Sequence, residues 1–326
     1  MSLRFRRLAT VATALVMALG STACGDDATQ DAAGGTTTAA ADESFPRVIK
    51  HDKGETTLET KPERIVALDL SLVGAVVSLE RPLVGGIATY RDLAGFPDYF
   101  GDAVKDSVEV GPLESPNLEA IAELEPDLIV SATVRHDELY DELSAIAPTV
   151  FVKTTGPTWK ENIRLVGEAL GEEAKADEVL TKYETRAANL GKAINEKAGN
   201  PKISVVRFVD GPTRLYTKGS FSGIILGDMG LARPDAQNVD EFTVEISEEQ
   251  IRMADGDYIF VAAFSGGTAT KDAFQRNPLW AELTGVKAGN THDADDAIWM
   301  TSVNLYGANM IMDDMAKVFD VDPLDD

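Results

Sequence analysis

The stretch EEAKADEVLTKYETRAANLGKAINEK, residues 172–197, decides the fold of this chain. Its apolar and small residues are separated by steps of three, one, three, four, three and four, which places them on one face of an α-helix. No proline interrupts the stretch. At about 1.5 Å per residue the helix would be roughly 35–40 Å long, enough to cross a small domain. The face consists of Ala176, Val179, Leu180, Tyr183, Ala187, Leu190 and Ile194.

This helix lies near the middle of the chain, and segments typical of strands and helices alternate on both sides of it. Such alternation predicts α/β structure with mostly parallel sheets. The helix could belong to one large domain, or it could be a rigid bridge between two α/β lobes. A crossover helix within one sheet is usually much shorter, which favours the bridge. We therefore predict lobes at 46–157 and 200–326, joined by a helical segment at 158–199.

The first residues have the composition of a targeting segment. Three arginines lie within the first seven residues, and the apolar run at 8–19 is too short to be a permanent transmembrane helix. Small residues then precede Cys24, in a pattern that resembles the lipobox of bacterial lipoproteins. We predict a lipoprotein signal peptide at 1–23 and lipidation of Cys24. The alternative is an ordinary secretory leader cleaved near Ala23, followed by a chance cysteine.

Cys24 is the only cysteine in the sequence, and a thiol at this one position favours the lipid anchor. Residues 25–44 are small and polar and lack a large apolar side chain. They predict a flexible tether at 24–45, which would reach roughly 25 Å. The folded body would then lie close to the extracytoplasmic face of the cell membrane.

Charge and missing motifs exclude several function classes. The formal net charge is −24, whereas nucleic-acid binding requires a basic surface. No nucleotide-binding glycine pattern follows a strand, and the serines of GSFSG at 219–223 are misplaced for a nucleophile elbow. The three histidines, His51, His136 and His292, have no paired spacing, so a metal site built from histidines is not expected. We expect neither enzymatic activity nor a cofactor.

Ligands of parallel α/β sheets bind beyond the carboxyl ends of the strands. In the first half, Tyr90, Arg91, Arg135 and Trp159 follow predicted strands. Each alone could be an ordinary solvated loop residue. Arginines and aromatics that recur at one edge would face a single crevice, which favours a ligand site.

The second half contributes further candidates. Arg207 interrupts the apolar strand KISVVRFVDG at 202–211, where an unpaired guanidinium would be costly to bury. It could form an internal ion pair, for instance with Asp210, or present its charge to a ligand. Tyr216 lies on a predicted hairpin arm, and Trp299 stands at the entrance of the last helix.

Several segments in a fixed order resemble a known family, the cluster-A substrate-binding receptors of bacterial iron-siderophore and cobalamin importers. The resemblance covers residues 62–319. It is carried by PERIVALDL (62–70), LERPLVG (79–85), PNLEAIAELEPDLIVS (116–131), LSAIAPTV (143–150), the long helix, ISEEQI (246–251) and NPLWAEL (277–283). The family fold, the class III periplasmic-binding-protein fold, has two Rossmann-like lobes joined by one rigid helix.

The resemblance implies a monomeric lipoprotein of an ABC importer, which captures a ferric siderophore between its lobes and delivers it to a membrane permease. Iron would be held by the chelator, with no metal ligand from the protein. Arg207 and Trp299 would be ligand contacts, joined by Tyr90, Arg91, Arg135, Trp159 and Tyr216. Few cations and several aromatics favour a hydroxamate or mixed chelate over a catecholate. Haem or cobalamin binding, or a chelatase or hydrolase of two-lobed shape, are the alternatives.

Two glutamates match the positions at which the family contacts its permease. Glu119 lies early in a predicted helix of the first lobe, and Glu249 lies early in a helix of the second. Acids are favoured in the first turn of any helix by roughly 0.3–1 kcal/mol, so each position alone has an ordinary explanation. Their pairing across two lobes favours permease docking.

Overall fold

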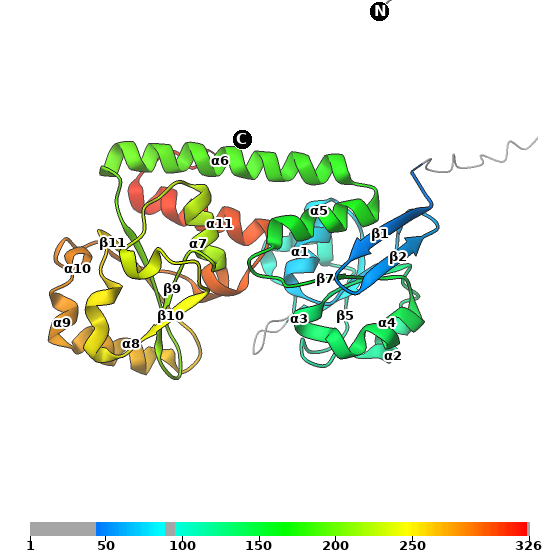
Figure 1. Ribbon diagram of the computed structural model, residues 1–326, viewed down its shortest axis with the longest axis horizontal. Coiled ribbons are helices and arrows are strands. Elements are labelled where there is room, and N and C mark those ends of the chain that lie inside the picture. The colour runs from blue at the N-terminus through cyan, green and yellow to red at the C-terminus, as the bar shows by residue number, and fades with distance from the viewer. Residues whose placement is uncertain (1–43, 89–94, 325–326) are drawn as a thin grey trace, which may run out of the picture. The chain divides into compact units, whose positions relative to one another are not determined.

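The α6 helix (Glu173–Ala198) crosses two α/β lobes, which we call the N lobe (residues 44–170) and the C lobe (residues 203–319) (Figure 1). The computed structural model describes residues 44–88 and 95–324. The helix α5 (Trp159–Leu170) precedes α6 in the chain. It ends at Gly171, because the φ of this residue is 65° and lies in the left-handed region. The predicted long helix is therefore confirmed.

The N lobe is built on a five-stranded parallel sheet in the order β5-β4-β3-β6-β7. Its strands are β3 (Ile65–Ala67), β4 (Leu83–Gly86), β5 (Val108–Glu109), β6 (Leu128–Ala132) and β7 (Thr149–Val152). Its other helices are α1 (Leu70–Ser78), η1 (Asp98–Val104), α2 (Leu118–Glu123), α3 (Thr133–His136), η2 (Asp137–Leu139) and α4 (Tyr140–Ile146). The parallel sheet predicted from alternation is present in this lobe.

The C lobe has a mixed sheet in the order β10-β9-β8-β11-β12. The strands are β8 (Ile203–Phe208), β9 (Thr213–Tyr216), β10 (Thr243–Ile246), β11 (Tyr258–Ala263) and β12 (Thr291–Asp293). Strand β9 pairs antiparallel with both neighbours, while β8, β11 and β12 are parallel. The helices are α7 (Phe221–Asp228), η3 (Asp235–Gln237), η4 (Glu248–Ala254), α8 (Gly267–Arg276), α9 (Pro278–Ala281), α10 (Thr284–Lys287), the π-helical turn η5 (Ala297–Thr301) and α11 (Leu305–Phe319).

An antiparallel hairpin, which was not predicted from the sequence, precedes the N-lobe sheet. It consists of β1 (Arg47–His51) and β2 (Gly54–Leu58). One apolar side chain from each strand, Ile49 and Leu58, is fully buried in the core. Each strand of the hairpin therefore contributes one side chain to the core of the lobe.

The apolar face of α6 is buried as its spacing predicts, with Leu180, Tyr183 and Leu190 each at most 2 % exposed. One hydrophobic cluster continues from α1 and α5 through α6 to α7 and α11. The two lobes therefore share a core along the helix, and residues 42–326 form one compact unit. The exact lobe boundaries at 157 and 199 stay a prediction.

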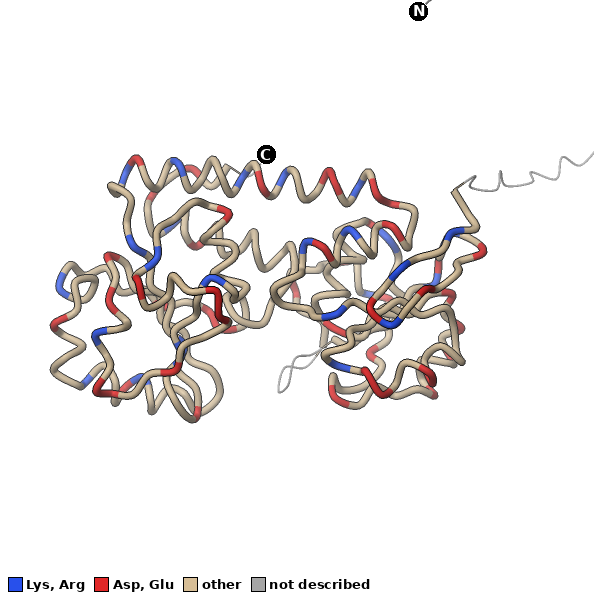
Figure 2. The backbone as a smooth tube through the Cα atoms, in the orientation of Figure 1, with Lys and Arg blue, Asp and Glu red and all other residues tan. Residues whose placement is uncertain are grey.

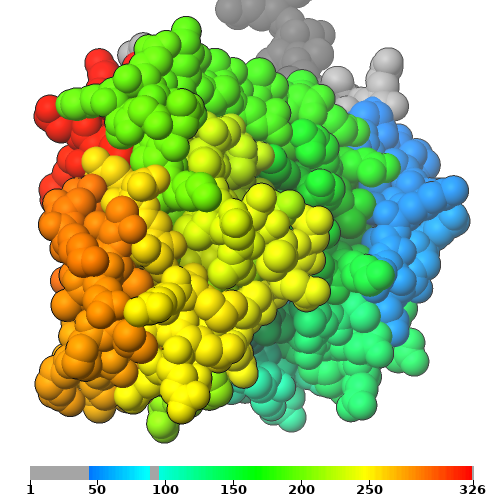
Figure 3. Space-filling model, turned by 60° about the vertical axis from the view of Figure 1, so that its left-hand side comes forward, coloured from blue at the N-terminus to red at the C-terminus, as the bar shows by residue number. Residues whose placement is uncertain are grey.

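The opposite face of α6 carries acidic and basic positions in close alternation (Figure 2). Figure 3 shows this helix in green above the yellow and orange surface of the C lobe, with the hairpin in blue on the N-lobe side. None of the helices within the described ranges combines the length and apolar character that crossing a membrane requires. The helix thus serves as a brace between the lobes, with one apolar and one solvated face.

Candidate ligand-binding cleft

A hollow of about 380 Å³ lies between the lobes, and it adjoins a second hollow of about 460 Å³ that is lined by the C lobe. We call the two together the cleft. Both hollows are lined by Tyr216, Phe242 and Met300 of the C lobe. The N lobe contributes Asp69, Val134, Arg135 and Thr155, and the C lobe adds Arg207, Arg214 and Phe264. A concave site with apolar walls and a few placed charges is typical of small-molecule binding.

The N-lobe wall presents Arg135 from the short helix α3. Its Nε donates a hydrogen bond to the Asp69 carboxylate over 2.9 Å. Asp69 is buried and also accepts from the backbone N–H of Ser71, which caps α1. About 29 % of the Arg135 side chain is exposed, so the guanidinium is held in place and still open to the cleft. Arg135 thus lies at the crevice where the sequence places it, and its contact with a ligand stays a prediction.

The C-lobe wall presents Arg207 from β8. Its Nε and Nη2 donate to the two carboxylate oxygens of Asp296, each over 2.6 Å, and its Nη1 donates to the Tyr216 hydroxyl over 2.8 Å. Burial alone would lower the pKa of Arg207, but the hydrogen bond to Asp296 and the neighbouring Tyr216 raise it above its usual value. The ion pair considered with Asp210 thus forms with Asp296, which is distant in sequence.

Aromatic side chains of the C lobe surround this guanidinium. The Phe264 ring lies 5.0 Å from the guanidinium carbon of Arg207, within cation–π range. Phe242 is 53 % exposed at the mouth, with its ring centroid 5.5 Å from that of Tyr216. Burial raises the pKa of Tyr216, so its hydroxyl is neutral at physiological pH. This wall can therefore hold a ligand with both anionic and apolar parts.

Several cleft residues were not identified from sequence, among them Arg214, Phe242, Phe264 and Met300. Arg214 pairs with Glu245 across β9 and β10 at 3.4 Å. Phe264 follows the end of β11, so the strand-end rule could have found it. Phe242 stands alone in a polar loop before β10, and no local pattern marks it.

The prediction that Trp159 and Trp299 contact the ligand is wrong, because both side chains are buried in the core. Trp159 is 1 % exposed and packs edge-on against the ring of Tyr183 on α6 at 5.0 Å. Trp299 is fully buried, stacks on Phe260 at 4.7 Å and donates its indole N–H to Asp314 over 2.8 Å. The apolar body of each indole is placed against the core shared with α6 and α11.

Other predicted residues lie elsewhere. Tyr90, Arg91 and Cys24 fall outside the described residues. Glu119 is exposed in the first turn of α2, and Glu249 is exposed in the first turn of η4. They belong to different lobes, as the docking prediction requires.

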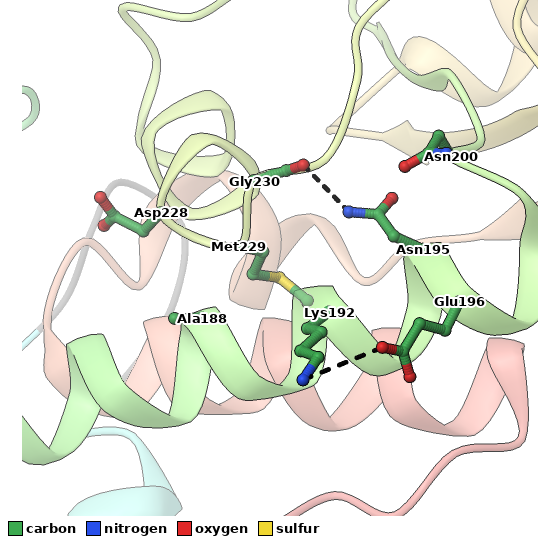
Figure 4. Close-up of a pocket in the computed structure, with 8 residues that line it drawn as sticks. All are labelled: Ala188, Lys192, Asn195, Glu196, Asn200, Asp228, Met229 and Gly230. Atoms are coloured by element: carbon green, nitrogen blue, oxygen red, sulfur yellow. Dashed lines mark hydrogen bonds and ion pairs between the residues drawn. The ribbon is translucent and has the colours of Figure 1, made fainter.

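A separate hollow of about 450 Å³ lies where the end of α7 meets the C-terminal half of α6 (Figure 4). Asn195 donates to the Gly230 carbonyl over 3.1 Å, and Lys192 pairs loosely with Glu196 at 3.9 Å. This hollow is open and has no lining residue in common with the cleft. Within the described ranges, no cluster of three His, Cys, Asp or Glu side chains could hold a metal ion.

Comparison with known proteins relates the chain to binding proteins. The probable siderophore-binding lipoprotein YfiY of Bacillus subtilis is 35 % identical over 289 residues, which cover 85 % of this chain and 88 % of the relative. The Fe(3+)-citrate-binding protein YfmC of the same organism is 35 % identical over 262 residues, which cover 78 % and 79 %.

A solved structure gives a similar result for the fold. Staphylococcus aureus SirA complexed with staphyloferrin B matches with a TM-score of 0.77 and 32 % identity, covering 85 % of this chain and 99 % of that structure. These names are those of binding proteins, not of enzymes, in agreement with the expectation of no catalysis. A model of the periplasmic binding protein family matches residues 65–297. The chain therefore belongs to the periplasmic binding protein family.

Proposed function

We propose that this protein is the extracytoplasmic receptor of an ABC importer, and that it captures a ferric siderophore in the cleft between its lobes. The observation that carries the proposal is that Arg135 of the N lobe and Arg207 of the C lobe line two adjoining hollows, which share Tyr216, Phe242 and Met300 as walls. The relatives named for siderophore and Fe(3+)-citrate binding support this ligand class. Iron would enter already chelated.

The chemistry of the cleft suits a ferric chelate with exposed oxygen atoms. Charge-assisted hydrogen bonds from guanidinium groups to anionic oxygens are stronger than neutral ones. Arg207 has hydrogen atoms on both terminal nitrogens beyond those bonded to Asp296 and Tyr216, so it can donate to a ligand without leaving its partners. Phe242 and Met300 would contact the apolar parts of the chelator.

Anchoring and delivery complete the proposal. Cys24, as the lipidated N-terminus of the mature chain, would hold the receptor at the membrane. Glu119 and Glu249 would meet the two halves of the permease, one from each lobe. Complementary charge at such contacts mainly steers and registers the encounter.

Titration calorimetry with purified protein tests this function. The panel comprises ferric citrate, a ferric trihydroxamate, a ferric tris-catecholate, haem and cobalamin. We expect one ferric chelate to bind with one-to-one stoichiometry and without turnover. Binding of haem or cobalamin alone, or of no member of the panel, would contradict the proposal.

A further inference from the structure

The arginine that the N lobe contributes to the cleft lies on a helix too short to be stable by itself. Helix α3 has four residues, Thr133–His136, and Arg135 stands within it. Isolated helices of this length are unstable in water, so tertiary contacts must hold α3 in place. The position of the Arg135 guanidinium in the cleft therefore depends on what grips this turn as well as on its hydrogen bond to Asp69.

On its inner side, α3 is held by His136. The buried imidazole bonds through Nδ1 to the Ser131 hydroxyl at 2.8 Å and through Nε2 to the Leu113 carbonyl at 2.6 Å. Burial lowers the pKa of His136, consistent with a neutral ring. This grip fixes the last residue of the helix and leaves its outer side to other contacts.

On its outer side, the turn of the β1–β2 hairpin grips both ends of α3. Asp52 accepts a hydrogen bond from the Thr133 hydroxyl over 2.6 Å, at the first residue of the helix. Lys53 donates to Asp137 over 2.7 Å, immediately after the last residue. Two neighbouring residues of one turn thus hold the beginning and the end of the segment that carries Arg135.

The hairpin is itself a fixed base for this grip. The backbone N–H of Asp52 donates to the Phe151 carbonyl of β7 over 3.0 Å. The Thr56 hydroxyl donates to the Thr149 carbonyl over 2.7 Å. Together with the buried Ile49, these contacts attach the hairpin to the edge of the N-lobe sheet. A rigid support of this kind is what a precisely placed binding group requires.

We propose that Asp52 and Lys53 are positioning residues for the ligand site, which clamp α3 and thereby set the place of Arg135 in the cleft. The proposal rests on the proposed function only for the identity of the ligand. Neither residue lines the cleft, so both act through Arg135. The hairpin is thus part of the binding machinery and not only a lead-in to the lobe.

The test compares two double variants that each remove one acid and one cation from the same hairpin. Asp52→Ala with Lys53→Met removes the clamp. Lys50→Met with Glu55→Ala is the matched control, because this exposed pair, 3.6 Å apart, lies on the strands and not at the turn. Thermal unfolding of both variants verifies that the lobe is intact, and Asp52→Ala alone replaces the double variant if that one fails to fold.

Hydrogen exchange of the ligand-free protein gives the first readout. We expect the amides of 133–137 to exchange about tenfold faster in the clamp variant and at the wild-type rate in the control. Unchanged exchange in the clamp variant would overturn the proposal. This readout requires no ligand, so it separates failure of the clamp from failure of the proposed function.

Binding gives the second readout, with ferric citrate as the first probe and the other ferric chelates of the panel after it. We expect the clamp variant to bind about three- to tenfold more weakly, as loss of one hydrogen bond and one exposed ion pair implies. In a protein that already carries Arg135→Ala, adding Asp52→Ala with Lys53→Met should have almost no effect on Kd. If Kd rises by the same factor as in the wild-type background, the clamp does not act through Arg135. Lys53→Arg should retain most of the affinity.

Discussion

The carbonyl oxygen of Met229 occupies the space that a side chain at residue 191 would need. A Cβ on Gly191 would lie 1.6 Å from this oxygen, closer than any real contact. Gly191 is therefore the point at which the end of α7 packs directly against α6. Gly191 has the weakest helix propensity in α6. Its missing side chain is nevertheless what allows the end of α7 in the C lobe to approach the helix this closely.

We predict that Gly191→Ala destabilises the protein, because the backbone of α7 must move away from α6. The cost should be about 1–3 kcal/mol, the usual range for overpacking. Gly227→Ala in α7 is the matched control, since a Cβ there meets no atom within 4 Å and alanine favours helix by about 1 kcal/mol. Chemical denaturation measures both, and an equally stable Gly191→Ala protein would contradict the close contact.

Loss of Arg207 should weaken binding of the preferred ferric chelate by roughly 1.5–3 kcal/mol, or about tenfold to more than a hundredfold in Kd. Arg207→Ala alone leaves the Asp296 carboxylate without its bidentate partner, so Arg207→Gln with Asp296→Asn is the better variant for binding. Arg252→Ala removes an exposed arginine outside the cleft and should bind as wild type. Wild-type affinity of the Arg207 variants, with the fold intact, would exclude this role.

Closure on ligand binding should be modest, because the lobes share a core and direct polar contacts. Lys160 of α5 pairs with Asp228 of α7 at 2.9 Å, and Tyr183 donates to the same carboxylate. Asn304 of the C lobe packs against Gly74 and donates to the Tyr99 hydroxyl over 3.2 Å. We expect free and loaded protein to differ by about 1 Å or less in radius of gyration by small-angle scattering. A change of several ångströms, or loss of helix in 173–198, would refute this.

Membrane anchoring should depend on Cys24. Cys24→Ser is expected to release the protein into the medium or to block its maturation, because the thiol is the only acceptor for the lipid. Cell fractionation and mass spectrometry of the N-terminal peptide measure the outcome. Soluble wild-type protein with an unmodified Cys24 would contradict the anchor.

Delivery to the permease should require the two docking glutamates. Glu119→Ala with Glu249→Ala should leave folding and ligand affinity nearly unchanged and should abolish or severely slow uptake of the ferric chelate by cells. The matched control is Glu123→Ala with Glu248→Ala, which removes one exposed acid from each of the same two helices. If cells with the Glu119→Ala, Glu249→Ala protein take up the chelate at the wild-type rate, at equal surface abundance, these two glutamates are not the docking residues.

The sequence by itself determined the elements whose signal is local and periodic. The spacing of apolar residues from Ala176 to Ile194 established α6 and its buried face, because a helical period exposes one side of the chain to the core. Alternation of strand and helix segments similarly established the parallel sheet of the N lobe. Arg135 and Arg207 were predicted as ligand contacts because each follows or interrupts a strand, and the structure places both in the lining of the cleft.

Only the tertiary structure decided which side chains meet across long stretches of chain. Trp159 and Trp299 point into the core because α6, α7 and α11 pack around them, which no local pattern reveals. Asp296 pairs with Arg207 because β8 and the start of η5 come together in the C lobe, although Asp210 is nearer in sequence. The grip of Asp52 and Lys53 on α3 likewise depends on the packing of a hairpin against a distant strand. The spacing of apolar residues shows which face of a helix is buried. Which residue a side chain pairs with depends on the three-dimensional path of the chain, because the two partners are far apart in the sequence.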